Sequence, residues 1–437
     1  MGTVWPVMAS QELLTVLDRR GLADPAADLP RPAIAGDEPT AAVRKIIEDV
    51  RARGDAALRD LTRRFDGPEL DRIDVSAEEL RAAAERVDPD VLHALRMARD
   101  AVQAFHRAQR PGPGRHERDG VTVDERWVPV GAAGCYVPGG RARYPSTVLM
   151  TAVPAREAGV DRVVLCVPPD ADGTVPDETL AAAHLADVDC VYRIGGAQAI
   201  AALAYGTESV EPVDVVVGPG NVYVALAKQE LAGIVDVPSS FAGPSEIVVV
   251  ADESTPTRYA AVDLVVQAEH GPDGAAWLIT WDEDVLTRVQ ADIAAVVAAS
   301  PRRADVESTL AAGGYAALVD GPDSAIAVAN AVAPEHLQLM TADPDELLPG
   351  IRHAGAIFCG PLAPASVGDY AAGPSHVLPT DGTARFASAL SVYDFLRQQH
   401  VVRVDATGFD LVGPIVETLA TAEGLDAHAE SIRVRRV

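Results

Sequence analysis

Hydrophobic and polar positions divide the chain into a helical first third and a longer part in which strands and helices alternate. In the first third, residues 76–79 (SAEE) have the sequence of a capping box, and Asp88-Pro89 has an N-cap acid before a proline at the first helical position. Gly112 and Pro113 interrupt this pattern, and from about residue 128 short β-branched runs alternate with alanine-rich stretches. The pattern predicts a helical N-terminal segment followed by α/β structure.

Apolar runs in the second part have the length and composition of strands that are buried on both faces. They are VVLCV (163–167), CVYRI (190–194), VDVVV (213–217), EIVVV (246–250), AWLITW (276–281), YAALVD (315–320) and AIFCG (356–360). The stretches between them, such as TLAAAHLA and NVYVALAKQELAG, predict crossover helices. We therefore expect an α/β fold with two Rossmann-like doubly wound units, closed by a small helical tail after about residue 390.

Composition and charge exclude several classes of protein. The chain has 437 residues, of which 48% are hydrophobic and 23% charged, as expected of a folded protein with several domains. A net charge of −27 repels polyphosphates, so nucleic acid is not an expected partner. The N-terminus lacks the pattern of a secretory signal, and the uncharged runs are shorter than the ~20 residues of a membrane span. We expect a cytoplasmic protein without membrane association, whose four scattered cysteines are reduced.

Glycine-containing segments stand next to the predicted strands, and sheets of this kind bind ligands beyond the carboxyl ends of their strands. IGGAQAI follows one strand, VGPGNVYVALAK follows the next, and FAGPSE precedes a third. Gly218 and Gly220 would allow the backbone to approach a phosphate at the start of the helix near Asn221. A strict G-x-G-x-x-G is absent from the sequence, so this segment fits either a nucleotide site or a plain strand–turn–helix corner.

Two short segments place an imidazole beside an oxygen ligand or a base. Gln267 and His270 are three residues apart at the end of a predicted helix, and this spacing puts both on one face. Such a pair can hold a cation, although a histidine at a helix C-terminus also interacts favourably with the helix dipole. Glu335 and His336 are adjacent, and in an extended or turn conformation they can act as a base and a proton shuttle on one substrate.

Two further segments supply polar side chains near the C-terminus. Asp369 and His376 lie in GDYAAGPSHVLPT, which has the composition of an ordered loop. Glu423 and His428 lie in TAEGLDAHAES, which also fits an exposed helix. Zinc is commonly held by histidine and carboxylate, so a mixed oxygen and nitrogen set is compatible with it. The candidate set is Gln267, His270, Asp369 and His428, which are dispersed along the chain, unlike the ligands of a compact H-E-x-x-H helix.

Eight segments occur in the order seen in histidinol dehydrogenases, and from about residue 130 to its end the chain resembles this family. The segments are GCYVPGGRARYPSTVLMTAVPA, IGGAQAIAAL, VGPGNVYVALAK, AGPSEI, QAEHGPD, APEHLQL, GDYAAGPSHVLPT and TAEGLDAHAES. The first third of the chain matches only in its helical character. The family's nucleotide domain resembles a Rossmann unit without the usual glycine fingerprint, which agrees with its absence here.

The resemblance implies a role for each matching residue. One zinc per subunit would be bound by Gln267, His270, Asp369 and His428. Glu335 and His336 would form the acid–base pair. NAD would be contacted by Tyr136, Gln198 and Asn221. The substrate would be surrounded by Ser245, Gln267, His270, His336, Asp369, His376, Glu423 and His428. In this family the last zinc ligand comes from the other subunit, so the resemblance also implies a homodimer whose tail crosses to its partner.

The implied reaction is the oxidation of L-histidinol to L-histidine through L-histidinal with two NAD, the last steps of histidine biosynthesis. The implied domains are an N-terminal helical arm (1–34), a larger α/β domain (35–135 with 245–390), an incomplete Rossmann-like NAD domain (136–244) and a C-terminal helical tail (391–437). One alternative is a dehydrogenase of the same family that acts on another small polar alcohol. Others are a non-catalytic zinc-binding protein and a zinc hydrolase, and the sequence does not separate NAD from NADP.

Overall fold

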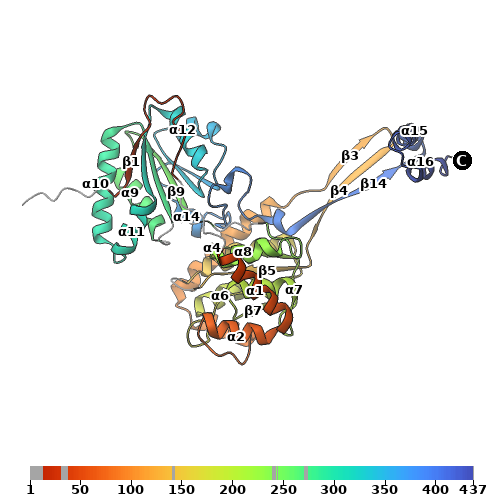
Figure 1. Cartoon of the computed structure of the whole chain (residues 1–437), viewed down its shortest axis with the longest axis horizontal. Coiled ribbons are helices and arrows are strands. Elements are labelled where there is room, and N and C mark those ends of the chain that lie inside the picture. Colours follow the sequence, from red (N-terminus) through yellow and green to blue (C-terminus); the bar gives the residue numbers. More distant parts are fainter. Residues whose placement is uncertain are drawn as a thin grey trace, which may run out of the picture.

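Two mostly parallel β-sheets and an antiparallel ribbon organise the chain (Figure 1). The structure is a computed structural model that describes residues 13–30, 38–139, 143–238, 243, 245–269 and 274–436. The predicted α/β architecture with two parallel-sheet cores is confirmed.

The larger sheet has six parallel strands in the order β1-β11-β10-β9-β12-β13. The strands are β1 (Thr15–Asp18), β9 (Glu246–Ala251), β10 (Ala275–Thr280), β11 (Gly314–Leu318), β12 (His336–Met340) and β13 (Ala356–Cys359). Chain order reverses between β9 and β12, as it does at the centre of a Rossmann sheet. Strands β9, β10 and β12 are buried along their whole length, which explains their nearly continuous apolar sequences.

Helices cover both faces of this sheet. One face packs against α9 (Thr257–Ala268), α10 (Glu283–Ala299), α11 (Arg303–Gly313) and the short α14 (Ala365–Tyr370). The other face packs against α12 (Pro322–Val332) and α13 (Pro344–Leu347), which is followed by the 3-10 turn η1 (Leu348–Gly350). The sheet is therefore doubly wound.

The smaller sheet has five strands in the order β2-β7-β6-β5-β8. They are β2 (Asp74–Val75), β5 (Ala132–Tyr136), β6 (Arg162–Cys166), β7 (Cys190–Tyr192) and β8 (Val215–Val217). All pairs are parallel except the edge pair β2–β7. Chain order reverses between β5 and β8, so a second ligand-binding crevice is expected at the carboxyl ends of these two strands.

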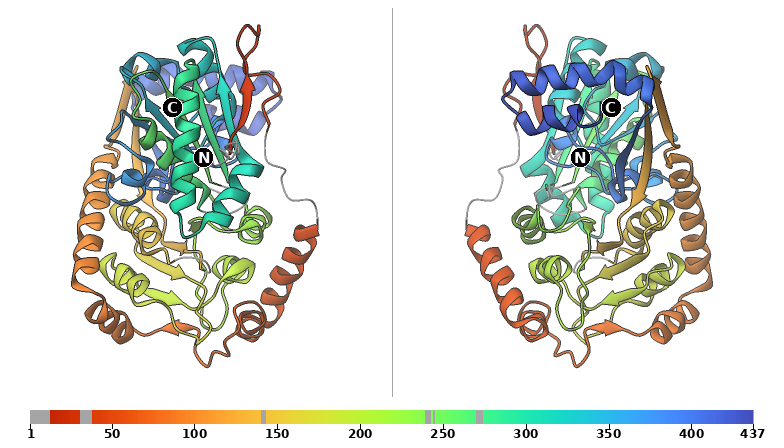
Figure 2. Two further views of the ribbon diagram at one scale, coloured as in Figure 1. Left: turned by 90° about the vertical axis from the view of Figure 1, so that its left-hand side faces the viewer. Right: turned by 90° about the vertical axis from the view of Figure 1, so that its right-hand side faces the viewer.

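The helices of the first third cover this smaller sheet together with its own crossover helices, as Figure 2 shows. On one face lie α3 (Ala77–Arg86), α4 (Pro89–Gln109), α5 (Pro145–Ala158) and α6 (Asp177–Leu185). On the other lie α1 (Glu38–Arg53), α2 (Asp55–Phe65), α7 (Gly196–Tyr205) and α8 (Val222–Leu231). Helices α1–α4, which fall within the predicted larger domain, thus pack against the five-stranded sheet.

An antiparallel ribbon leads away from both sheets and ends in two helices (Figure 1). Its strands are β3 (Gly114–Arg118), β4 (Val121–Pro129) and β14 (Leu396–Val404), in the order β14-β4-β3. The helices are α15 (Ala406–Ala422) and α16 (Asp426–Arg433), and we call this ribbon with its two helices the arm. The arm exposes large apolar side chains, among them Leu411, Ile415 and Leu419, which follow one another at a spacing of four on α15.

Several local predictions can be compared with these elements. All seven predicted strands are present, and Asp88 caps α4 as predicted. The predicted helical tail is present only in part, because β14 precedes α15 and the turns η2 (Thr383–Arg385) and η3 (Val392–Phe395) precede β14. The prediction of a helical N-terminal arm is wrong for the described residues 13–30, which contain strand β1 and no helix. The capping box is only half formed: Ser76 accepts a hydrogen bond from the backbone of Glu79, whose carboxylate pairs with Arg193 at 2.5 Å.

Two further expectations concern membranes and thiols. A helix with the length and apolar character of a membrane span does not occur in the part of the chain that the structure describes. The four cysteines are free thiols, as predicted, and Cys135 and Cys166 are buried.

Candidate functional site

Glu335 and His336 lie at the point where helix α12 gives way to strand β12. Ala333 ends the helix with a positive φ of 51°, and Pro334 cannot continue it. His336 is the first residue of β12, so the pair is in the extended conformation that lets adjacent side chains reach different atoms of one ligand. Both side chains are buried, with relative exposures of 6% for Glu335 and 5% for His336.

The first residue of the neighbouring strand β9 holds both members of this pair. The backbone N–H of Glu246 donates a hydrogen bond of 3.1 Å to Glu335 Oε2. The carbonyl oxygen of Glu246 lies 3.2 Å from His336 Nδ1 and, being an acceptor, receives the proton of that nitrogen. Nε2 is therefore the His336 nitrogen that can take up a proton. The pair lies at the amino edge of the six-stranded sheet, because β9 and β12 are parallel and both begin here.

Asp369 approaches His336 from helix α14. Its Oδ1 lies 3.5 Å from His336 Nε2, the same distance that separates His336 Nδ1 from Glu335 Oε2. Phe358 stacks on the imidazole with 6.0 Å between ring centroids. A Cβ on Gly368 would lie 2.6 Å from the Phe358 ring, so glycine lets α14 come close enough for Asp369 to reach His336.

His376 connects this group to the five-stranded sheet. Its Nδ1 lies 2.9 Å from the backbone carbonyl oxygen of Asp369, and its Nε2 lies 3.1 Å from Thr147 Oγ1. Thr147 is in the first turn of α5, which follows β5, at the carboxyl edge of the five-stranded sheet. The residue before His376 makes a second contact with α5: Ser375 Oγ donates a hydrogen bond of 2.9 Å to the carbonyl oxygen of Met150. The structure thus joins the amino edge of one sheet to the carboxyl edge of the other.

Burial and charge shift the proton affinities of the pair. Burial raises the pKa of the Glu335 carboxyl, although the neighbouring His336 and a hydrogen bond from Ser245 act in the opposite direction. Burial disfavours the imidazolium, but the carboxylates of Glu335 and Asp369 outweigh it and raise the pKa of His336 to about 9. Both groups are consequently stronger bases than in water, as acid–base catalysts often are.

The four predicted zinc ligands are not all brought together within one chain. Gln267 is in the last turn of α9 and 3% exposed, and its Nε2 has no hydrogen-bond partner among the described residues. His270 lies outside the described residues. His428 is exposed on α16 at the end of the arm, far from Asp369 (Figure 1). The described part of a single chain contains no group of three histidine, cysteine or acidic side chains suited to a metal ion.

Some of the remaining predicted substrate residues lie beside the Glu335–His336 pair, and the others lie on the arm. Ser245 directly precedes β9, where its hydroxyl hydrogen-bonds Glu335. Glu423 is the exposed C-cap of α15 on the arm and lies near His428 in the chain. Ser245, Glu335, His336, Asp369 and His376 are therefore near one another by direct contacts, whereas Glu423 and His428 are remote from them.

The three residues predicted to contact NAD share one edge of the five-stranded sheet. Tyr136 ends β5, and its hydroxyl accepts a 3.0 Å hydrogen bond from the backbone of Gly196. Gln198 lies in the first turn of α7, is 1% exposed, and has an Oε1 without a partner among the described residues. Asn221 caps α8, its Oδ1 accepting from the N–H groups of Tyr223 and Val224. Gln198 and Asn221 therefore stand at two of the helix N-termini of this edge, which favour an anionic ligand.

Gly218 shapes the turn that leads from β8 into α8. Its φ is 107°, and a Cβ at this position would lie 2.1 Å from the carbonyl oxygen of Tyr136. We expect Gly218→Ala to lower the free energy of unfolding by about 2 kcal/mol or more, because both the backbone conformation and the contact oppose a side chain. Urea unfolding measures this. Gly112→Ala is the control, since a Cβ there meets nothing within 4 Å; equal effects of the two variants would contradict the argument.

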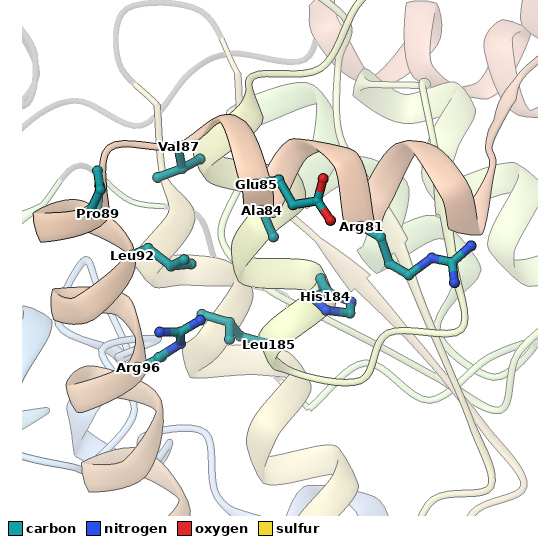
Figure 3. A pocket seen from close by; sticks show the side chains of 9 residues that line it. All are labelled: Arg81, Ala84, Glu85, Val87, Pro89, Leu92, Arg96, His184 and Leu185. Atoms are coloured by element: carbon teal, nitrogen blue, oxygen red, sulfur yellow. The ribbon is translucent and has the colours of Figure 1, made fainter.

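A pocket of about 500 Å³ opens elsewhere on the molecule, between α3, α4 and α6 (Figure 3). Its walls combine apolar side chains such as Leu92 and Leu185 with the exposed Arg81, Arg96 and His184. None of the residues predicted for catalysis, metal or cofactor binding lines it, so it is separate from the candidate site.

Sequence reasoning missed residues whose role is visible only in three dimensions. Thr147, Glu246 and Phe358 contact the predicted residues through a hydroxyl, a backbone and an aromatic ring. Glu246 acts through its peptide groups, so its side-chain identity carries no signal. Thr147 lies within a segment that resembles the family, and this resemblance is the only sequence signal that could have identified it.

Comparisons with known proteins agree with this arrangement. Residues 29–436 match the family model described as histidinol dehydrogenase. A histidinol dehydrogenase from Synechococcus sp. is 48% identical over 91% of this chain and 92% of its own, and one from Methanothermobacter thermautotrophicus is 45% identical over 91% and 94%. The crystal structure of histidinol dehydrogenase from Elizabethkingia anophelis superposes with a TM-score of 0.94 at 34% identity, over 97% of this chain and 98% of that one.

Proposed function

The chain belongs to the histidinol dehydrogenase family, and from this premise we propose that it oxidises L-histidinol to L-histidine through L-histidinal, with two NAD per substrate. It is an oxidoreductase. The observation that carries the proposal is the buried Glu335–His336 pair, joined through Asp369 and His376 to the edge of the five-stranded sheet. The bases at the amino edge of the six-stranded sheet and a cofactor at the carboxyl edge of the five-stranded sheet would then act on one substrate bound between these edges.

The two bases divide the reaction between them. His336 accepts the alcohol proton at Nε2 during the first hydride transfer, since Nδ1 already donates to Glu246. With a pKa of about 9, only the neutral fraction of this imidazole can act at neutral pH, and that fraction grows as the pH rises. Glu335 takes a proton from the water that attacks the aldehyde. The resulting hydrate then loses the second hydride to NAD while His336 takes its hydroxyl proton, which leaves the carboxylic acid. Burial strengthens this carboxylate as a base, and the Glu246 N–H and Ser245 hydroxyl keep it oriented.

Gln267, His270 and Asp369, with His428 of a second chain, are the residues that would hold zinc. Imidazole and carboxylate groups fit that ion, and Gln267 would bind it through its side-chain oxygen. The Nε2 of this buried side chain has no partner among the described residues, so the end of the side chain is not fully engaged by them. When bound, zinc would supply orientation of the substrate's amino and imidazole nitrogens. Ser245, His376 and Glu423 would complete the substrate's surroundings.

The cofactor site would lie at the carboxyl ends of β5 and β8. Tyr136, Gln198 and Asn221 stand there, and the turn at Gly218 allows close approach of a phosphate. A nicotinamide placed at this edge would face the substrate held by the other sheet.

A homodimer with exchanged arms would explain the two remote residues. Glu423 and His428 are exposed on an arm that leads away from the chain's own site (Figure 1). The row Leu411, Ile415 and Leu419 leaves an apolar face on the same arm, with exposures of 54%, 58% and 58%. Contact with a second chain would bury this face and deliver His428 to the partner's Gln267 and Asp369.

The proposal predicts two NADH per L-histidinol and a loss of turnover on chelation. NADH absorbance with purified protein measures both, before chelation, after it and after zinc is returned. Recovery with zinc supports the proposed ligand set. Zinc binding without NADH formation would contradict the substrate assignment. Other small polar alcohols would then be tested as substrates, and failure with these would favour a non-catalytic role.

A further inference from the structure

Lysine is rare in this chain and one of its lysines is buried. The sequence contains 35 arginines but only two lysines, Lys45 and Lys228. Lys45 is exposed on α1, whereas Lys228 is 2% exposed on α8. Lysine is seldom found fully buried, since removing its ammonium group from water is costly. A buried lysine in a chain that otherwise uses arginine therefore calls for a specific reason.

The ammonium group of Lys228 is directed at the turn that precedes its own helix. It donates a hydrogen bond to the carbonyl oxygen of Gly218, ten residues earlier. At the other end of this turn, the Oδ1 of Asn221 accepts from two N–H groups of α8. Gly218 also lies against the backbone of Tyr136. The turn is consequently fixed from the helix, from its cap and from the neighbouring strand.

This turn occupies the reversal point of the five-stranded sheet, between β5 and β8. Dinucleotides bind at such reversal points with their phosphates near a helix N-terminus. A protein with a net charge of −27 repels such an anion at long range, so a local positive charge matters. Salt screens a buried charge less than an exposed one, so Lys228 keeps its attraction at physiological ionic strength.

We propose that Lys228 is a positioning residue for the dinucleotide cofactor, which orients the turn from Gly218 to Asn221 and places a positive charge beneath the cofactor's phosphates. This inference rests on the proposed function, because it presupposes a cofactor at this edge. Burial lowers the pKa of Lys228 to about 8, and an anion bound nearby would raise it again.

Steady-state kinetics of Lys228→Met test the inference. The KM for NAD is expected to rise by roughly ten- to a hundredfold, the usual effect of losing a hydrogen bond to a charged group. The KM for L-histidinol is expected to stay within about twofold, because none of the residues assigned to the substrate lies on the five-stranded sheet. Lys45→Met is the matched control and should change neither constant. Lys228→Arg should restore little, since a guanidinium is too bulky for a site shaped for an ammonium.

A second measurement uses the folded wild-type protein and so does not depend on the stability of a variant. Lysine labelled with ¹³C at Cε gives signals from two residues, and Lys45→Met identifies the signal of Lys45. Addition of NAD should shift the Lys228 signal and raise its apparent pKa, while that of Lys45 stays unchanged.

The outcomes separate this inference from the function on which it rests. NADH formation with an unshifted Lys228 signal and an unchanged KM for NAD in Lys228→Met would overturn the role of Lys228 alone. No NADH formation by the wild type would overturn the proposed function. A purely structural role would lower the thermal stability of Lys228→Met without a selective rise in the KM for NAD, and that result also overturns the inference.

Discussion

Replacing Glu335 by glutamine is expected to stop the second oxidation while the first continues. Activation of water needs a carboxylate, and the loss of a general base costs about 10²–10⁴-fold in rate. The alcohol step depends on His336 and should fall far less. Glutamine retains an oxygen that can accept the hydrogen bond from Glu246, so the surrounding structure should persist.

The two oxidations can be measured separately by supplying L-histidinol or L-histidinal to the variant. Glu335→Gln should form NADH from the alcohol in a single step and almost none from the aldehyde, whereas a His336→Asn variant should be slow with both. Glu346→Gln, on the exposed surface of α13, is the control for charge removal. Full four-electron turnover by Glu335→Gln would show that another group activates water.

Mixing two variants is expected to restore the oxidation of L-histidinal when one defect lies on the body of the chain and the other on the arm. Glu335→Gln damages a residue beside the sheet, whereas His428→Ala damages one at the end of the arm. With exchanged arms, a mixed dimer holds one doubly damaged site and one intact site. Random reassociation then makes half of the dimers mixed, so about a quarter of all sites should work.

The appropriate readout is NADH formation from L-histidinal, which Glu335→Gln alone should not give, after the two proteins are unfolded together and refolded. A mixture of Glu335→Gln and His336→Asn is the control, because both residues lie on the body of one chain and every site stays damaged. Recovery in the control, or none in the test mixture, would contradict a site that is shared between subunits.

The hydrophobic content of single segments predicted the strands of both sheets, but it failed where a strand has another sequence character. Strand β12 begins with His336 and contains Gln338, so it does not form an apolar run although all of it is buried. In β5, the small Gly134 is required because a Cβ would lie 2.9 Å from Leu203. Strand β14 is mostly exposed and polar, since it belongs to the arm rather than to a core.

The candidate site was predictable only in part, because several of its residues contact one another although they are far apart in the sequence. The adjacency of Glu335 and His336 is visible in the sequence, and their extended conformation follows from Pro334 and the start of β12. Their contacts with Asp369 and the link through His376 to Thr147 join three separate segments. The raised pKa of Glu335 depends on burial by these segments, so composition and local spacing cannot supply it. The roles of the site residues remain predictions.

The hydrogen bond between Thr147 and His376 has a consequence for the order of events in turnover. Under the proposed function, the spent cofactor must leave and a fresh one must enter while the aldehyde stays bound. Most residues assigned to the substrate stand beside the six-stranded sheet, and those assigned to NAD stand on the five-stranded one. This hydrogen bond of 3.1 Å joins the two neighbourhoods, together with the Ser375–Met150 contact and the packing of Val377 and Leu390 in the core beside α4 and α5.

The hydrogen bond itself contributes only about 0.5–1.5 kcal/mol, so it can break and re-form while the packing of Val377 and Leu390 keeps the two parts joined. Loop movements occur on the nanosecond to microsecond scale, faster than typical turnover. Cofactor exchange on one side could then proceed without release of the reactive aldehyde on the other. Because substrate and cofactor residues belong to different sheets, the aldehyde would stay bound throughout the exchange of one cofactor for the next.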